Sequence, residues 1–136
     1  MDLMTVIFVG LITIFLLWRL LSLYRSRQMQ GRSVPDINSL LSERQKVSSR
    51  LLIYFWSQQC VMCKGMSKII AELAETHDDI LKIDAMQNME ITAGFGIMGT
   101  PSLVLVNEGK IEKMMLGTKS KSQIIEILDR DHTEGR

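Results

Sequence analysis

The sequence predicts an α/β domain, a mixed sheet flanked by helices, that follows a single N-terminal transmembrane helix. Three observations support this fold class. A continuous apolar stretch occupies the start of the 136-residue chain, strand-like and helix-like segments alternate after it, and the only two cysteines lie three positions apart. We expect four segments along the chain: a transmembrane anchor over residues 1–24, a basic linker over 25–35, one folded domain over 36–131 and a C-terminal tail over 132–136.

The apolar stretch is long enough to cross a lipid bilayer. From Leu3 to Tyr24 only Arg19, Gly10 and a few hydroxyl side chains interrupt it, and at about 1.5 Å per residue it spans roughly 33 Å. Its apolar residues surround the helix instead of forming one stripe, which argues against a buried core helix. A signal peptide would need basic residues before the stretch and a small-residue cleavage site after it. We therefore expect an uncleaved anchor that contacts the lipid bilayer through residues 3–24.

Charges at the two ends of the anchor predict its orientation. Basic side chains lie at or beyond its C-terminal end, whereas the other end offers only Asp2 and the α-amino group. The basic residues are Arg19, Arg25, Arg27 and Arg32. Because basic flanks stay in the cytoplasm, we expect a single-pass protein of the cell membrane with its folded domain in the cytoplasm. A periplasmic or otherwise extracytoplasmic domain is the alternative.

The charge balance of the folded part excludes one class of partner. Residues 35–136 carry 12 basic and 14 acidic side chains, a net charge of −2. A domain that binds nucleic acid would show an excess of positive charge, so we expect no nucleic-acid partner. About a hundred residues are enough to bury one core.

Hydrophobic periodicity predicts the first elements of the domain. A helix is expected to start at Pro35, with Asp36 as its cap and an apolar stripe after it. The continuous apolar run Leu51–Trp56 predicts a buried strand. Residues from Lys64 to about Glu75 predict a helix, and the alternation in Ile80–Asp84 predicts a second strand.

The later elements complete a sheet. A short helix is expected at about Glu90 to Phe95, followed by a strand over Ser102–Val106. Asn107–Lys110 reads as a hairpin turn, Lys110–Leu116 as its partner strand and Ser120–Leu128 as an amphipathic helix. Strands joined by a hairpin are antiparallel and strands joined by a helix can be parallel, so a mixed sheet with helices on both faces results.

Cys60 and Cys63 provide the chemistry of the chain. At the start of a helix, positions i and i+3 lie on one face, so the two sulfurs can close a disulfide. The first sulfur would sit beside unpaired backbone N–H groups and the positive end of the helix dipole, which favour the reactive thiolate. We therefore assign Cys60 as the nucleophile and Cys63 as the resolving thiol.

Two other readings of the cysteines are a zinc site and a pair of inert structural thiols. Zinc needs about four ligands, yet there is no second cysteine pair, and His77 and His132 have no ligand-like spacing. A copper site built from methionines is unsupported because these residues do not cluster on one helical face. We expect no metal and no other cofactor, and we expect five methionines to be core or groove residues: Met86, Met89, Met98, Met114 and Met115.

The order and spacing of the motifs resemble the thioredoxin family over roughly Asp36 to Asp129. The matching features are Phe55-Trp56 before the dithiol, Cys60-x-x-Cys63-Lys64, Gly99-Thr100-Pro101, the Asn107-Glu108-Gly109-Lys110 turn, and Gly117 before Lys119-Ser120-Lys121.

The resemblance implies a thioredoxin-like fold, a cis peptide bond before Pro101 and a groove in which an extended substrate docks. Thr100 and Pro101 would face Cys60 and pair with the backbone of the substrate. The alternative for Pro101 is a trans proline at the start of a strand. Residues from three segments would line the groove: Val61, Met62, Gly99, Thr100, Pro101, Leu116 and Gly117.

The chain departs from the family pattern at several positions. Gln59, Val61 and Met62 replace the usual residues around and between the cysteines, which tune thiol reactivity and reduction potential. Tyr54 takes the place of the buried acid, and Ile80 that of its lysine partner. The second thiol must then rely on water or another group for proton transfer. The apolar Val61-Met62 pair fits docking to a particular protein, although Met62 could instead pack locally.

Three functional hypotheses follow. The first is a membrane-tethered thiol–disulfide oxidoreductase that exchanges a Cys60–Cys63 dithiol or disulfide with a protein partner through a Cys60 mixed disulfide. In the cytoplasm the reducing thiol pool would make it a reductase. The second is the same chemistry on the extracytoplasmic side, where similar tethered proteins reduce apocytochromes or other exported proteins. The third is a non-catalytic thioredoxin-like subunit or assembly factor of a membrane protein complex.

Overall fold

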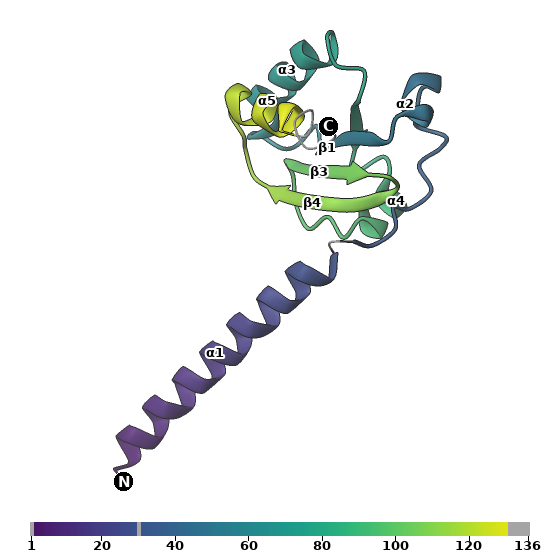
Figure 1. Ribbon diagram of the computed structural model, residues 1–136. Helices are drawn as coiled ribbons and strands as arrows, with labels where there is room; N and C mark the ends of the chain where they lie inside the picture. The colour runs from purple at the N-terminus through teal and green to yellow at the C-terminus, as the bar shows by residue number, and fades with distance from the viewer. Residues whose placement is uncertain (1, 30, 131–136) are drawn as a thin grey trace.

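The computed structural model describes residues 2–29 and 31–130, and for residues 22–29 it describes the backbone alone. One long helix, α1 (Leu3–Met29), precedes a folded domain of strands and shorter helices (Figure 1). In chain order the elements of the domain are α2 (Glu43–Val47), β1 (Arg50–Trp56), α3 (Cys63–Ala74), β2 (Ile80–Asp84), α4 (Met89–Gly94), β3 (Ser102–Asn107), β4 (Lys110–Leu116) and α5 (Lys121–Asp129).

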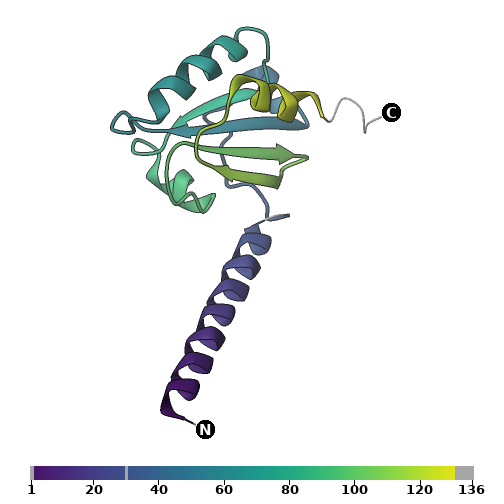
Figure 2. The ribbon, with the colours of Figure 1, turned by 90° about the vertical axis from the view of Figure 1, so that its left-hand side faces the viewer.

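The sheet is mixed, which confirms the predicted fold class. Its four strands have the order β2-β1-β3-β4. β1 and β2, which are connected through α3, run parallel. β1 pairs antiparallel with β3, and β3 pairs antiparallel with β4 across the hairpin turn. A parallel pair needs a long crossover and an antiparallel pair needs only a tight turn, so the connections explain the directions of the β1–β2 and β3–β4 pairs. α3 and α5 cover one face of the sheet, and α4 lies on the other (Figure 2).

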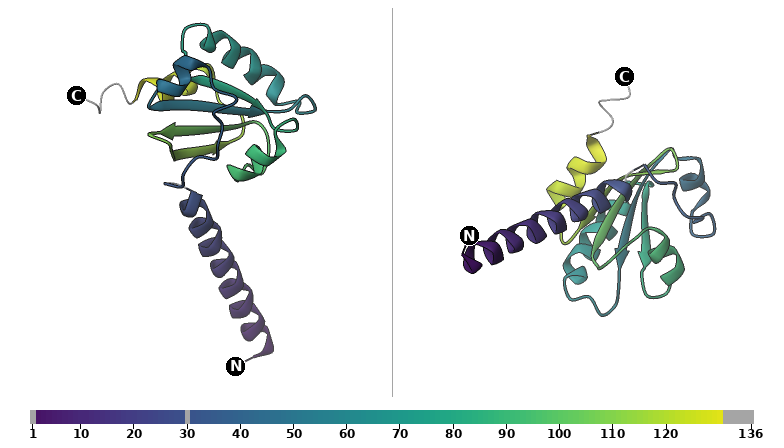
Figure 3. Two further views of the ribbon diagram at one scale, coloured as in Figure 1. Left: turned by 90° about the vertical axis from the view of Figure 1, so that its right-hand side faces the viewer. Right: turned by 90° about the horizontal axis from the view of Figure 1, so that it is seen from below.

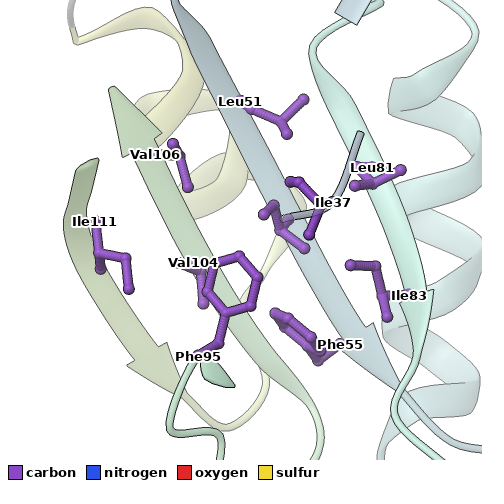
Figure 4. Packing of buried hydrophobic residues seen from close by; sticks show 10 residues of the cluster. Ile37, Leu51, Phe55, Leu81, Ile83, Phe95, Val104, Val106 and Ile111 are labelled. Atoms are coloured by element: carbon purple, nitrogen blue, oxygen red, sulfur yellow. The ribbon is translucent and has the colours of Figure 1, made fainter. Parts of the chain in front are cut away.

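The central strand β1 is buried on both faces, so its side chains alternate between two cores. Leu52 and Tyr54 pack with the inner faces of α3 and α5. On the opposite face, Ile53 and Phe55 join residues of β2, β3, β4 and the chain before α2 (Figure 4). There the rings of Phe55 and Phe95 meet edge to face, with centroids 5.3 Å apart. A strand with both faces buried reads as a continuous apolar run, which is why the pattern was recognisable in the sequence.

α1 contains a segment suited to a membrane. The window Leu3–Leu21 has a mean hydropathy of 2.3, and none of it is buried. α1 projects away from the domain (Figure 3). By length and composition this helix can cross a bilayer. The helix continues to Met29, so the first part of the expected basic linker is helical.

The rest of the expected linker pairs with the hairpin. The backbone N–H of Gly31 donates to the carbonyl of Ile111 at 2.8 Å, and that of Val34 donates to the carbonyl of Gly109 at 3.0 Å. Ser33 forms an isolated antiparallel bridge with Lys110. These contacts, which we call the edge ladder, cover part of the free edge of β4 and so protect it from pairing with another chain. Only residue 30 separates α1 from the edge ladder, so the domain is held close to the end of α1.

The prediction of a helix that starts at Pro35 is wrong. Asp36 Oδ1 instead accepts hydrogen bonds from the backbone N–H and the side-chain amide of Asn38, at 3.0 and 2.8 Å. A side chain that bonds the backbone two residues ahead closes a turn and competes with helix formation. The helix begins later, as α2, with Ser42 as its cap. Ser42 and Gln45 form a reciprocal capping box.

The other predicted elements are confirmed within one or two residues. The helix expected from Lys64 is α3, the short helix expected from Glu90 is α4, and the last helix is α5. Differences of this size at element ends are ordinary fraying. The C-terminal tail expected over residues 132–136 lies outside the described residues, so it stays a prediction, as do the segment boundaries.

Candidate active site

The two cysteines lie where β1 passes into α3. β1 ends at Trp56 and the chain turns through residues 57–62 before α3 begins at Cys63. The backbone N–H of Cys60 donates to the carbonyl of Ser57 at 3.3 Å, which closes this turn. α3 is anchored to the sheet by the apolar residues of its inner face, namely Met66, Ile70 and Leu73. The packing of α3 against β1 therefore holds the start of the helix beside the end of the strand.

Cys60 and Cys63 form a disulfide, with Cα atoms 5.3 Å apart. The backbone N–H of Cys63 also donates to Cys60 Sγ at 3.1 Å. In the dithiol form, this N–H and the helix dipole behind it stabilise negative charge on the Cys60 sulfur. Cys60 precedes the helix instead of lying in its first turn, yet its sulfur still meets a backbone donor at the helix end. The expectation that the two sulfurs lie within bonding distance is confirmed.

The two sulfurs differ in exposure. Cys60 is partly exposed, whereas Cys63 is 1% exposed. The intervening Val61 and Met62 are 77% and 58% exposed, so Met62 does not simply fill a gap in the core. A partner can therefore reach Cys60 directly, while Cys63 lies shielded beneath it. An attacking thiol needs access and a resolving thiol does not, so this difference supports the assigned roles, which stay a prediction.

The other residues expected to line a substrate groove are linked to the turn that carries Cys60. The Thr100–Pro101 peptide bond is cis, as the resemblance implied. Thr100 Oγ1 lies 3.5 Å from Ser57 Oγ, in the turn before Cys60. The backbone N–H of Gly117 donates to the carbonyl of Pro101 at 2.9 Å.

Leu116 and Gly99 complete this surface. A Cβ atom on Gly99 would lie 3.6 Å from Leu116 Cδ1, so the leucine side chain lies over the glycine. Leu116 is itself 66% exposed. Gly117 follows with a φ of +94°, a conformation that favours glycine. The C-terminal end of β4 and the Gly99–Pro101 segment thus form one surface.

Tyr54, which takes the place of the family's buried acid, lies below the start of α3. Its side chain is fully buried. Its hydroxyl donates to the carbonyl of Cys63 at 3.2 Å and shares a hydrogen bond with Ser67 Oγ at 3.0 Å. Burial raises the pKa of Tyr54 above its ordinary value of 10.0, and the hydrogen bond with Ser67 offsets part of this rise. The hydroxyl is therefore neutral at physiological pH, and no carboxylate is buried in the described part of the chain.

Sequence reasoning missed two hydroxyl groups of the site. Ser57 connects the Cys60 turn to Thr100, and Ser67 connects α3 to Tyr54. A serine one turn after Cys63 on the helix face toward β1 was the available signal for Ser67, whereas nothing in the sequence pointed to Ser57. The five methionines divide into two groups: Met114 and Met115 pack against the cores, and Met86, Met89 and Met98 are exposed.

The described residues contain no cluster suited to a metal ion. Across residues 2–29 and 31–130, no three histidine, cysteine or acidic side chains come together. His77 Nδ1 lies 3.0 Å from the carbonyl of Leu73, just past the end of α3, where a histidine suits the helix dipole. His132 lies outside the described residues.

Comparisons with known proteins match this geometry. The family model named Thioredoxin matches residues 38–130, more than half of the chain. The chain belongs to the thioredoxin family. Thioredoxin from Alicyclobacillus acidocaldarius subsp. acidocaldarius is 35% identical over 77 residues, which cover 54% of this chain and 73% of that protein. Thioredoxin from Staphylococcus haemolyticus is 33% identical over 82 residues, which cover 58% of this chain and 79% of that protein.

A solved thioredoxin structure shares the fold. A point mutant of the thioredoxin from Halobacterium salinarum superimposes with a TM-score of 0.62, covering 75% of this chain and 90% of that chain at 21% identity. Together, the family match and the disulfide-forming cysteine pair identify this thioredoxin-family chain as a thiol–disulfide oxidoreductase.

Proposed function

We propose that this thioredoxin-family enzyme is tethered to a membrane by α1 and exchanges disulfides with a protein partner through a mixed disulfide at Cys60. The observation that supports this most strongly is the unequal environment of the two sulfurs. Cys60 Sγ accepts a hydrogen bond from the helix end and is partly exposed, whereas Cys63 is buried. The first sulfur is suited to attack and the second to resolve.

The exchange has two steps. The Cys60 thiolate attacks one sulfur of the partner disulfide, and the other partner sulfur leaves as a thiolate. Cys63 loses its proton to water and attacks Cys60 Sγ in the mixed disulfide, which releases the second partner sulfur. Two electrons pass to the partner, whose two thiolates take up two protons, and Cys60 and Cys63 end as a disulfide. A dithiol reductant must then reduce this disulfide before the next cycle.

The proposed site of action is the cytoplasmic face of the membrane. Arg19, Arg25 and Arg27 near the C-terminal end of the apolar segment support this orientation. The cytoplasmic thiol pool would keep Cys60 and Cys63 mostly reduced and favour reduction of the partner. The short connection between α1 and the edge ladder would restrict partners to proteins at the membrane surface.

Tyr54 favours a second candidate function, a non-catalytic subunit or assembly factor of a membrane complex. The tyrosine hydroxyl is bonded to the Cys63 carbonyl and to Ser67, so it is not free to take a proton from Cys63. Without a buried acid, turnover as a general reductase would be slow. A chain selected mainly for binding would tolerate that loss.

Disulfide reduction by the full chain distinguishes the two candidates. With the protein in lipid nanodiscs and dithiothreitol as reductant, we expect faster reduction of insulin than with Cys60→Ser or Cys63→Ser. When reduced Cys63→Ser is freed of dithiothreitol and then mixed with insulin, it should accumulate a mixed disulfide with the substrate, because its Cys60 can attack but no resolving thiol is present. A wild-type rate equal to that of Cys60→Ser would support the non-catalytic role. Trapping by Cys60→Ser in place of Cys63→Ser would reverse the assigned roles.

A further inference from the structure

Most exposed apolar side chains of the folded domain come from a few segments, one of which carries the dithiol. Outside α1, seven large apolar side chains are exposed in the described part of the chain. Six of them come from the Cys60–Cys63 turn, the flanks of α4, the segment before Pro101 and the end of β4: Val61, Met62, Met86, Met89, Met98 and Leu116. The seventh, Val47, belongs to α2. Contiguous exposed apolar surface on a soluble domain marks an interaction site, because its exposure to water is unfavourable.

Three of the methionines line one groove. Met86, Met89 and Met98 are 59%, 66% and 96% exposed and border a groove of about 340 Å³. None of the ten described residues that line it is charged. Three of the ten, Ser57, Gly99 and Thr100, also belong to the surface beside Cys60, so the groove is continuous with the active site.

The ribbon agrees with this arrangement. α4 and the turn that precedes α3 lie at the same end of the sheet in two views (Figures 2 and 3). Residues 86 and 89 flank the start of α4, and residue 98 follows its end. An extended segment bound across Cys60 can therefore reach this groove.

We propose that Met86, Met89 and Met98 bind an apolar segment that flanks the disulfide of a partner protein. We call these three residues the methionine collar. The inference rests on the proposed function, which it deepens by naming the class of polypeptide that the site selects. Methionine is unbranched and flexible, so it can adapt to apolar side chains of different shape. The absence of charge in the groove leaves an acidic or basic segment without a counter-ion there.

The test uses the full chain in lipid nanodiscs and two synthetic peptides. Each peptide has the same length and one intramolecular disulfide, flanked by leucine and valine in one peptide and by serine and glutamine in the other. We expect the kcat/KM of wild type to be roughly tenfold higher for the apolar peptide than for the serine and glutamine peptide. Partial burial of a few apolar side chains can supply this difference. In a triple variant, Met86→Gln, Met89→Gln and Met98→Gln, the ratio should fall close to one.

Val47→Gln is the matched control. It removes an exposed apolar side chain, 86% exposed, that lies outside the groove. Its kcat/KM ratio should equal that of wild type, and the same ratio in the triple variant would overturn the proposal.

A second measurement separates the collar from the catalytic proposal. A fluorescent apolar peptide without cysteine should bind wild type and Cys60→Ser equally in an anisotropy titration, and about tenfold more weakly to the triple variant. If neither disulfide peptide is reduced but this difference in binding persists, the reductase proposal fails and the collar stands. Equal binding to the triple variant would overturn the collar. Concentration-dependent self-association that the triple variant abolishes would also overturn it, because a second copy would then be the occupant.

Discussion

At the position where the family keeps a buried acid, this chain buries Tyr54. The side chain packs in the core between the sheet and α3, and its hydroxyl reaches the carbonyl of Cys63 and Ser67 Oγ. Burying a hydroxyl without partners would cost free energy, and both of its hydrogen-bonding roles are satisfied here. The residue therefore secures the first turn of α3 below the dithiol, and it does so without a charge.

A pH titration of stability tests the role of Tyr54. Because burial raises its pKa, the folded state holds the phenol proton more tightly than the unfolded chain does. Its contribution is complete below the unfolded pKa, about 10, and is lost as pH rises through the higher folded pKa. We expect the free energy of unfolding to fall more steeply above pH 10 in wild type than in Tyr54→Phe.

The measurement is near-ultraviolet circular dichroism during urea unfolding at pH 8 and pH 11, with the disulfide intact. At pH 8, Tyr54→Phe should be less stable by about 1 kcal/mol, because the Cys63 carbonyl and Ser67 lose a hydrogen-bond partner. Parallel pH dependence in the two proteins would show that Tyr54 does not titrate with unfolding.

At the scale of elements, α4 packs closely against the segment that precedes α2. A Cβ atom on Gly94, the last residue of α4, would lie 2.9 Å from Pro35 Cγ. Such a distance is too short for two carbon atoms, so only glycine allows this approach. Pro35 thus packs on α4 in place of starting the helix expected there.

Replacing two glycines should change stability in opposite directions. Gly94→Ala forces Pro35 or α4 to move and should destabilise the domain by about 1–3 kcal/mol. Gly65, inside α3, has nothing within 4 Å of its Cβ position. Gly65→Ala should stabilise the domain by about 0.5–1 kcal/mol, because alanine is the better helix former. Urea midpoints of the oxidised proteins measure both effects, and a stabilising Gly94→Ala would contradict the packing argument.

At the scale of the whole molecule, the connection between the apolar helix α1 and the redox domain is very short. The edge ladder runs from Gly31 to Val34 along β4, and only residue 30 lies between its start and the end of α1. A long flexible linker would let the domain reach farther from the end of α1. If α1 spans a membrane as proposed, this short connection would keep the domain, and any partner that it binds, close to the bilayer.

Carbonate extraction tests the membrane anchor. The full chain should remain in the membrane pellet at high pH. Leu11→Lys with Ile12→Lys should move it to the supernatant, since each lysine near the centre of a span costs about 2.5–3.5 kcal/mol on insertion. Release of the unmodified chain would contradict a transmembrane α1.

Thiol labelling of intact cells tests the orientation. A membrane-impermeant maleimide should leave Cys60 unmodified, and a permeant reagent should then modify it, because a cytoplasmic domain is shielded by the membrane and kept reduced. A mass shift with the impermeant reagent would place the domain on the extracytoplasmic side.

Local sequence patterns determined the elements and the redox pair. The continuous apolar run of β1, the helical stripe of α3 and the alternation in β2 each report which faces are buried, so they could be interpreted without a structure. The redox chemistry of Cys60 and Cys63 was also predictable from their spacing after a strand, because both sulfurs lie at one helix end. The cis bond at Pro101 was predictable only through the family resemblance.

The tertiary structure decided what depends on residues far apart in the chain. The chain forms a turn at Asp36 instead of a helix. In this conformation Ile37 is buried in the core and Pro35 packs on Gly94. The edge ladder depends on β4, and the exposure of Met86 and Met98 depends on where α4 lies beside the active site. Methionine is compatible with core and surface alike, so no periodicity could assign it. In each case packing between distant segments decided the outcome, because the free-energy differences between the local alternatives are small.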